Sequence, residues 1–260
     1  MTEYPERNTS RAAGWSRRTA AFSLVLLATV WIGHHYGLVE TRGYLWVSAL
    51  VALLAALALI LAAFGFARVW NRGDEGGRDL TMAIVVALVV LAPFGLAAYR
   101  LTEYPPLKDI ATDWDDPPLL DVSDRTADMN RLRPPTPGER RLQQESYPLV
   151  ATHRYDLPLA DVADAVKTVL GRHHWRLKRA FPAAEDGMTE ITVQALTSTL
   201  GFDLPADIAV RISVEGDSTF VDMRSASRYG RHDLGENAAR IAGFLDDLDV
   251  EAAARLGLVN

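Results

Sequence analysis

Three long apolar runs lie in the first part of the chain, at residues 19–38, 44–66 and 80–99. They hold 20, 23 and 20 residues, and none contains Asp, Glu, Lys or Arg. At a helical rise of about 1.5 Å per residue, each run is roughly 30 Å long or more, which matches the hydrocarbon core of a bilayer. The pattern predicts three transmembrane helices, in a membrane domain at residues 19–100.

The second run is rich in alanine and contains small residues four positions apart, Ala52 with Ala56 and Ala58 with Ala62. Small side chains let helix backbones approach closely inside a membrane. The two pairs therefore predict tight helix packing, either against another helix of this chain or against another membrane protein.

Arginine near the ends of the runs indicates their orientation. The tail at residues 1–18 holds four Arg and the loop at residues 67–79 holds three, whereas the turn at residues 39–43 holds only Arg42. Because Lys and Arg are enriched in cytoplasmic loops, the tail and the loop are predicted to be cytoplasmic. Three spans then predict a plasma (inner) membrane protein with a cytoplasmic N-terminus and an extracytoplasmic, periplasmic C-terminal domain.

Residues 101–148 lack a sustained apolar period and hold eight of the 13 prolines. Proline-rich chain with many charges favours an extended conformation. We therefore predict an extended linker whose aspartates are solvated. No part of it has the ligand spacing of a calcium-binding loop.

The pattern becomes that of a globular domain at residues 149–260. Ile208, Val210 and Ile212 alternate with Ala209 and Arg211, which is the period of a half-buried strand. Other stretches have helical spacing. The predicted strands are residues 153–157, 175–181, 190–195, 207–214 and 219–224, and the predicted helices are residues 159–173 and one that begins at Asp233. The order β-α-β-β-β-β-α predicts an α+β fold, an antiparallel sheet with two helices on one face.

Composition excludes several classes of function. The chain is 49% hydrophobic with a net charge of −6, and from residue 100 onward it holds 19 basic and 27 acidic residues, a net charge of −8. Nucleic-acid binding needs clustered cations and is not expected. The absence of cysteine from the sequence excludes disulfides, iron–sulfur clusters and cysteine nucleophiles. The sequence contains no motif for a metal or a cofactor, so neither is predicted.

The most distinctive motif runs from the last predicted strand into the last predicted helix. It consists of Arg224, Ser225, Ser227, Arg228, Gly230, Asp233, Gly235, Asn237 and Arg240. This motif resembles the signature of domain-of-unknown-function family 1499, and residues 109–113 and 201–207 resemble further segments of that family. The resemblance implies a family domain on a membrane-anchored bacterial protein, without an established activity.

The signature predicts an anion-binding site between the sheet edge and the helix start, because helix N-termini favour anions. The residues expected to line it are Arg224, Ser225, Ser227, Arg228, Tyr229, Asn237 and Arg240. The residues expected to shape the corner are Asp222, Gly230, Asp233, Gly235 and Glu236, with Asp233 and Glu236 in a capping box. Arg228 is expected to point away from the core and to tolerate replacement by Lys.

The alternative is a structural corner that binds no ligand. In that arrangement Asp233 caps the helix, Asn237 and Arg240 bond loop carbonyls, and Arg224 pairs with Asp222. Asp222 and Arg224 are two positions apart on a strand and so share one face, and Arg211 on the neighbouring strand is expected beside them.

These observations favour a non-enzymatic membrane protein, an accessory subunit or assembly and stability factor of a membrane complex, whose outer domain is a recognition module. Its expected partners are the lipid bilayer and other membrane proteins. The alternative is a binding protein for an anionic small molecule or a lipid headgroup. A more distant alternative is a hydrolase that uses Ser225 or Ser227 with His232 and Asp233, although residues so close in sequence rarely reach catalytic geometry.

Overall fold

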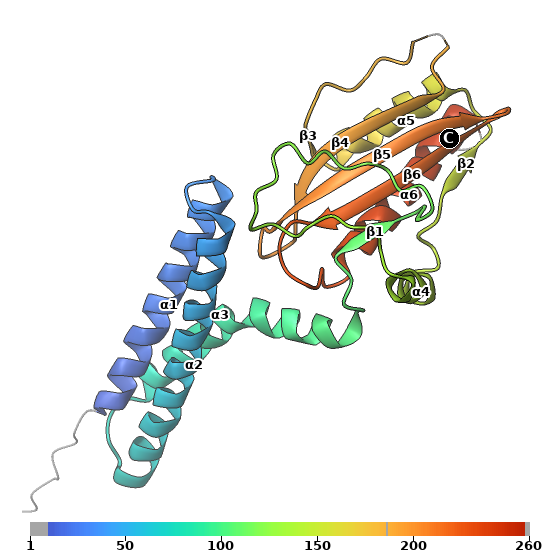
Figure 1. The fold of residues 1–260 in the computed structure, drawn as a ribbon. Coiled ribbons are helices and arrows are strands. Elements are labelled where there is room, and N and C mark those ends of the chain that lie inside the picture. The colour runs from blue at the N-terminus through green and yellow to red at the C-terminus, as the bar shows by residue number, and fades with distance from the viewer. Residues whose placement is uncertain (1–9, 186, 258–260) are drawn as a thin grey trace, which may run out of the picture. The chain divides into compact units, whose positions relative to one another are not determined.

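A computed structural model of the chain describes residues 10–185 and 187–257, with six helices and six strands in that part. The chain forms two compact units (Figure 1). The helical unit extends to Tyr99. The sheet unit, which begins at Arg100, is built on one antiparallel sheet, so the fold is mixed α+β as predicted.

The helical unit contains α1 (Arg11–His35), α2 (Thr41–Arg72) and the greater part of α3 (Gly77–Glu103). By length and composition, α2 and α3 can cross a membrane. Two of the three predicted spans are therefore supported, and α1 is not among these candidates. Its apolar part is only 17 residues long, since the helix ends at His35 and not at residue 38. That length corresponds to roughly 25 Å, less than the hydrocarbon core.

Small residues form the packing surface of α2. They recur at spacings of three and four and are buried: Ala55, Ala58, Ala62 and Gly65. Alanines of α1 and α3 pack against them. A Cβ on Gly65 would lie 2.7 Å from a methyl carbon of Leu80, so the backbones approach closely there. The buried alanines are therefore used for packing within this chain, which was one of the two predicted alternatives.

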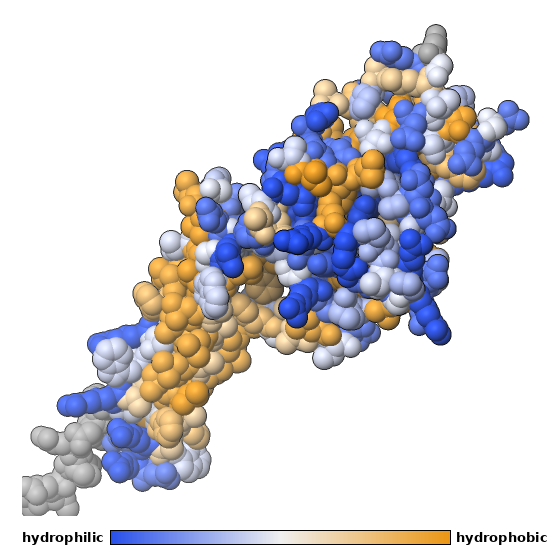
Figure 2. Space-filling model, in the orientation of Figure 1, coloured by the Kyte–Doolittle hydropathy of each residue, from blue (hydrophilic) through white to orange (hydrophobic). Residues whose placement is uncertain are grey.

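Large apolar side chains cover the outer surface of the helices. Leu53 and Phe64 of α2 are 65% and 64% exposed, and Figure 2 shows a continuous apolar surface over the helical unit. A surface of this kind fits contact with lipid hydrocarbon rather than with water.

All six strands of the sheet unit pair in antiparallel fashion, in the order β1-β6-β5-β4-β3, with β2 also paired to β6. Their bounds are β1 (Asp109–Ala111), β2 (His153–Tyr155), β3 (Arg176–Leu177), β4 (Glu190–Ser198), β5 (Pro205–Glu215) and β6 (Ser218–Ser227). The last two form a hairpin whose register places Arg211 opposite Asp222.

Two helices, α5 (Leu159–Arg172) and α6 (Glu236–Arg255), contribute to the hydrophobic core of the sheet unit. Ile208 and Met223 from the centre of the sheet are fully buried in the same core. Because side chains alternate along a strand, the other face of the sheet needs a different cover.

The segment predicted as a linker provides that cover, so it is not an exposed connector. It contains β1 and α4 (Pro137–Ser146), and Leu120 packs on the sheet with Ala209 and Ala226. We call residues 109–135 the covering segment. It shows no apolar period because most of its contacts with the sheet are polar, as the site shows below.

Candidate functional site

The signature residues lie on two opposite faces of the sheet. Ser225 and Ser227 of β6 face the helices, where Ser225 bonds to Asn237 of α6. Arg224 lies on the other face and meets the covering segment. Strand alternation therefore divides the residues that were predicted to line one anion site. The structure does not bring Arg224, Arg228 and Arg240 together around a common pocket.

Arg224 is buried in an ion pair with the covering segment. Its Nε and Nη2 donate to the two carboxylate oxygens of Asp109, at 2.9 and 2.8 Å. Its guanidinium lies 5.8 Å from the centre of the Trp114 ring. The prediction that Arg224 pairs with Asp222 is wrong, because the Asp109 carboxylate on β1 binds the Arg224 guanidinium directly.

Asp222 is instead the partner of Arg211. Arg211 Nη2 donates to Asp222 Oδ2 at 3.0 Å, and its Nη1 donates to Asp116 at 2.6 Å. Thr112 and Thr152 donate their hydroxyls to the other oxygen of Asp222. The predicted position of Arg211 beside Asp222 is therefore confirmed, and a second aspartate of the covering segment is paired.

Arg228 is 6% exposed, so the expectation that it points away from the core is wrong. Its Nη2 donates to Asp207 Oδ1 and Asp124 Oδ2, both at 2.6 Å, and its Nε donates to Asp207 Oδ2 at 3.0 Å. Lys178 also contacts both carboxylates, and Arg125 donates to Asp207. We call these five residues the Asp207 cluster. A Lys at 228 has no planar fork with which to make these contacts.

Asp124 belongs to the covering segment and is the outer acid of this cluster. Burial raises its pKa, but hydrogen bonds from Lys178 and Arg228 outweigh burial and lower the pKa to about 2. The carboxylate therefore stays ionised, and paired with Arg228, over the physiological range. The ion pair between Asp124 of the covering segment and Arg228 next to β6 is therefore present throughout that range.

On the helix face, four signature side chains satisfy one another. Ser225 Oγ donates to Asn237 Oδ1 at 2.8 Å, and Asn237 Nδ2 donates to Ser227 Oγ at 3.0 Å. Arg240 donates to Ser225 Oγ and Asn237 Oδ1 at 3.0 and 2.8 Å. Burial lowers the pKa of Arg240 despite the nearby carboxylates of Glu236 and Asp233. This network holds α6 against β6.

Asp233 binds the first turn of α6, but it is not the N-cap that was predicted, because the helix begins at Glu236 and its N-cap is Gly235. Its carboxylate accepts from the backbone N–H of Gly235 and of Asn237, both at 3.0 Å. Burial raises the pKa of Asp233, and these two N–H groups partly oppose that rise. The predicted capping box is wrong in its second half, because the Glu236 carboxylate accepts from the N–H of Leu200 instead.

The start of α6 also holds the peptide that follows α3. We call residues 104–108 the exit segment. Its carbonyls accept hydrogen bonds from the signature region: Lys108 O from Ser227 N and Asn237 Nδ2, at 2.8 and 3.0 Å, and Leu107 O from Asp233 N, at 2.9 Å. A ring nitrogen of His232 also lies 2.9 Å from Tyr104 O. We call the donors on Ser227, His232, Asp233 and Asn237, together with Gly235, the clamp.

Gly235 allows the exit segment to lie close against the clamp. Its φ is +80°, in the left-handed region that favours glycine. A Cβ at this position would lie 2.6 Å from Cδ1 of the Tyr104 ring. The glycine is therefore needed both for its backbone conformation and for the space that the ring occupies.

The two remaining predicted site residues, Tyr229 and Gly230, contact the covering segment. Tyr229 donates its hydroxyl to Asp128 at 3.2 Å. Gly230 has a φ of +84°, and its carbonyl accepts from Asn130 at 2.8 Å. Asn130 also donates to Ser227 O, so this loop is fixed from both sides.

The serines and the histidine proposed for a hydrolase are not in contact with one another. Both ring nitrogens of His232 face backbone groups, Tyr104 O and the N–H of Leu234. The hydroxyls of Ser225 and Ser227 face Asn237. The side chains have the geometry of a structural network.

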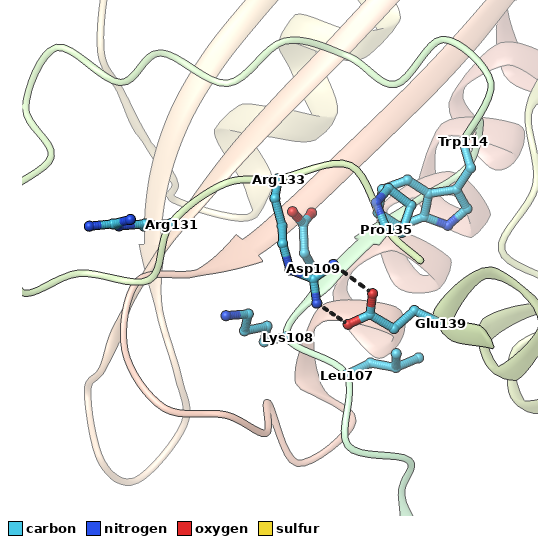
Figure 3. A pocket seen from close by; sticks show the side chains of 8 residues that line it. All are labelled: Leu107, Lys108, Asp109, Trp114, Arg131, Arg133, Pro135 and Glu139. Carbon is cyan, nitrogen blue, oxygen red and sulfur yellow. Dashed lines mark hydrogen bonds and ion pairs between the residues drawn. The ribbon is translucent and has the colours of Figure 1, made fainter. Parts of the chain in front are cut away.

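A hollow opens beside the exit segment, and we call it the Trp114 pocket (Figure 3). It is lined by Leu107, Lys108, Asp109, Trp114, Arg131, Arg133, Pro135 and Glu139. Arg133 donates to both oxygens of Glu139, at 2.8 and 2.6 Å. Hydrogen bonds from Arg133 lower the pKa of Glu139 to about 2, and the N–H and hydroxyl of Thr136 add to the effect against the opposing influence of burial.

Sequence analysis did not identify the lining of this pocket. Only Asp109 lies in a segment that resembles the family, and its partner was not foreseen. Lys108 and Arg131 occur among many other charges of a proline-rich stretch, where no motif distinguishes them.

The fold and the site define an α+β domain with an internally paired arginine and aspartate network, attached to apolar helices. The model of the family described as "Protein of unknown function (DUF1499)" matches residues 109–248, and the chain belongs to this family. The match begins at β1 and so includes the covering segment, whose aspartates are the partners of the signature arginines.

Among solved structures, the chain is similar to CalU16 from Micromonospora echinospora. The two are 19% identical, and the similarity covers 40% of this chain and 75% of that chain with a TM-score of 0.27. A comparison with curated proteins finds no match.

Proposed function

We propose that this chain is a non-enzymatic membrane protein in which α2 and α3 anchor the sheet unit at a membrane surface, where it is the recognition module of an accessory subunit or assembly factor. The observation that carries the anchoring role is the length of α2 and α3 together with their exposed apolar side chains. The internal pairing of the signature residues supports a structural role for the signature, so the recognition surface that we propose lies elsewhere on the unit.

The orientation that we propose rests on the loop between α2 and α3. Residues 67–79, which comprise this loop and the helix ends on either side of it, carry three Arg, which favours the cytoplasmic side of a plasma (inner) membrane. The sheet unit follows α3 and therefore lies on the opposite, extracytoplasmic side. This argument needs only two spans, so it does not depend on α1.

A topology experiment tests the orientation. A reporter enzyme that is active only outside the cytoplasm is expected to be active when fused after Asn260 and inactive when inserted after Gly73. The second fusion is the control, since Gly73 ends α2. Activity of a cytoplasm-only reporter after Asn260 would place the sheet unit in the cytoplasm and overturn this localisation.

Two exposed apolar side chains of the covering segment support recognition of a membrane protein partner. Leu119 and Val122 are 79% and 59% exposed, although Leu120 between them is buried. Figure 2 shows apolar residues bordered by polar ones on the sheet unit. Apolar residues that gather on a polar surface commonly mark contact sites.

Substitution of these two residues tests the recognition role. Leu119→Glu with Val122→Glu is expected to abolish co-purification of integral membrane proteins with the full chain in mild detergent. The measurement is quantitative mass spectrometry of the eluate. Leu149→Glu is the matched control, because Leu149 is 80% exposed and lies outside the covering segment. Equal loss with the control, or retention with both, contradicts the proposed surface.

A specific observation also favours the alternative function, binding of an anionic small molecule or lipid headgroup. It does not come from the predicted lining residues, which are internally paired, but from the Trp114 pocket.

A further inference from the structure

We propose that the Trp114 pocket binds a phosphate group, carried by an anionic lipid headgroup or present as free phosphate, and that Lys108 and Arg131 are its principal ligands. The pocket is a shallow hollow that opens to solvent and has about 30 Å³ of room for atoms of water size, which suits the oxygen end of a phosphate whose carrier stays outside. Neither cation belongs to the family signature.

The charges around the pocket leave two cations without a partner. Within residues 10–185 and 187–257, the Lys108 ammonium and the Arg131 guanidinium form no hydrogen bond or ion pair, whereas Arg133 is paired with Glu139. Figure 3 shows Lys108 and Arg131 on the side of this pair that faces away from Trp114. Lys108 and Arg131 are therefore the two lining cations that are available to an anion.

The two carboxylates in the lining do not oppose an anion, because each is already neutralised. Both oxygens of Asp109 accept from Arg224 and both oxygens of Glu139 accept from Arg133. With a pKa of about 2, Glu139 remains ionised and bound to Arg133 at physiological pH. The lining therefore has a surplus of positive charge on Lys108 and Arg131.

The walls of the pocket are held in place by bonds elsewhere in the unit. The clamp fixes the carbonyl of Lys108 through Ser227 and Asn237. Trp114 Nε1 donates to Gln143 at 2.6 Å, and Gln143 donates to the carbonyl of Ala111 at 2.8 Å. A pocket whose backbone and aromatic wall are fixed loses less entropy when it binds a ligand.

Phosphate fits this arrangement better than a carboxylate does. Its three terminal oxygens accept from several donors at once, and charge-assisted bonds from Lys and Arg are the common way to hold it. The lining also includes three apolar residues, Leu107, Trp114 and Pro135. In this way the signature acts indirectly, by positioning Lys108.

A lipid is a reachable source of this phosphate. Lys108 follows the end of α3 by five residues, and five extended residues span at most about 18 Å. This step rests on the proposed membrane attachment, whereas binding of free phosphate does not.

The experiment uses the full chain in non-ionic detergent with two probes, inorganic phosphate and short-chain phosphatidylglycerol, and measures binding by calorimetry. Lys108→Ala with Arg131→Ala is expected to weaken binding about tenfold or more, as expected for loss of charged hydrogen bonds. The control, Lys167→Ala with Arg141→Ala, removes the same charge at exposed positions on α5 and α4 and is expected to bind as the native chain does.

Each result decides one point. Binding of both probes supports a phosphate site for either source, binding of phosphatidylglycerol alone supports a headgroup site, and binding of inorganic phosphate alone supports a free-phosphate site. Failure of the native chain to bind either probe, or equal binding by the pocket variant and the control, overturns the proposal. Thermal melting of both double variants checks that they fold. If the pocket double variant does not fold, the single variant Lys108→Glu takes its place, and it should abolish binding. The topology fusions report separately on the proposed function.

Discussion

Asp207→Asn is expected to destabilise the sheet unit by roughly 3–5 kcal/mol, the cost of breaking a buried ion pair by removing one partner. Asp207 is fully buried and accepts from Arg228, Arg125 and Lys178, whose side chains are 7%, 8% and 7% exposed. The amide of Asn has a similar shape but no charge, and its N–H₂ group would face a guanidinium. Arg228 and Lys178 would then have Asp124 as their remaining carboxylate, and Arg125 would keep only the carbonyl of Asn130.

Urea unfolding of the full chain in detergent, followed by proteolysis of the sheet unit, measures this change. Asp164→Asn on α5 is the matched control, because Asp164 is exposed and the same substitution there should change the free energy of unfolding by less than about 0.5 kcal/mol. If Asp207→Asn were as mild as the control, the Asp207 cluster would not hold the covering segment on the sheet.

The parts of the fold that were predictable are those with a local pattern. The alternation at residues 207–214 marked β5, and helical spacing marked α5, because one side of each element is buried in the core. The apolar runs marked α2 and α3 because each run is long and apolar on all sides of the helix. At α1 the apolar run continues beyond His35, where the helix has already ended, so the predicted C-terminal end of this helix lay three residues too far along the chain.

The covering segment was not predictable, because its stability comes from partners distant in sequence. Asp109 pairs with Arg224 and Asp124 pairs with Arg228, across separations of more than 100 residues. Without knowledge of those partners, a stretch rich in proline and aspartate is predicted to be an extended, solvated linker. The capping box of Thr136 and Glu139 was a local signal for α4 that sequence analysis passed over.

The candidate site was predictable in its members but not in its geometry. Asp233 was correctly expected to bind the start of α6, because that contact is local, but the helix begins three residues later than predicted, after Gly235. The division of Ser225 from Arg224 between two faces also follows from strand alternation. Neither the Asp233 contact nor the strand alternation predicts that the signature binds the carbonyls of the exit segment. That contact depends on the position of residues 104–108, which is not a local property of the signature.

Gly235→Ala is expected to destabilise the sheet unit by about 2–5 kcal/mol, and the effect should depend on Tyr104. About 1–2 kcal/mol comes from a non-glycine residue in the left-handed region, and about 1–3 kcal/mol comes from overpacking against the Tyr104 ring. Gly230→Ala is the matched control, because its φ of +84° is nearly the same while the nearest atom to its Cβ, His232 O, lies at 3.6 Å. It should therefore show the backbone cost alone.

A double-mutant cycle with Tyr104→Ala isolates the contact between the clamp and the exit segment. Removal of the ring leaves room for the Cβ, so Gly235→Ala should cost only about 1–2 kcal/mol in the Tyr104→Ala background, which is close to the control. Unfolding of the four full-length chains in detergent supplies the coupling energy. If Gly235→Ala costs the same with and without the ring, Tyr104 does not pack against Gly235. In that case the signature glycine serves only the turn before α6, and the clamp does not hold the exit segment through this contact.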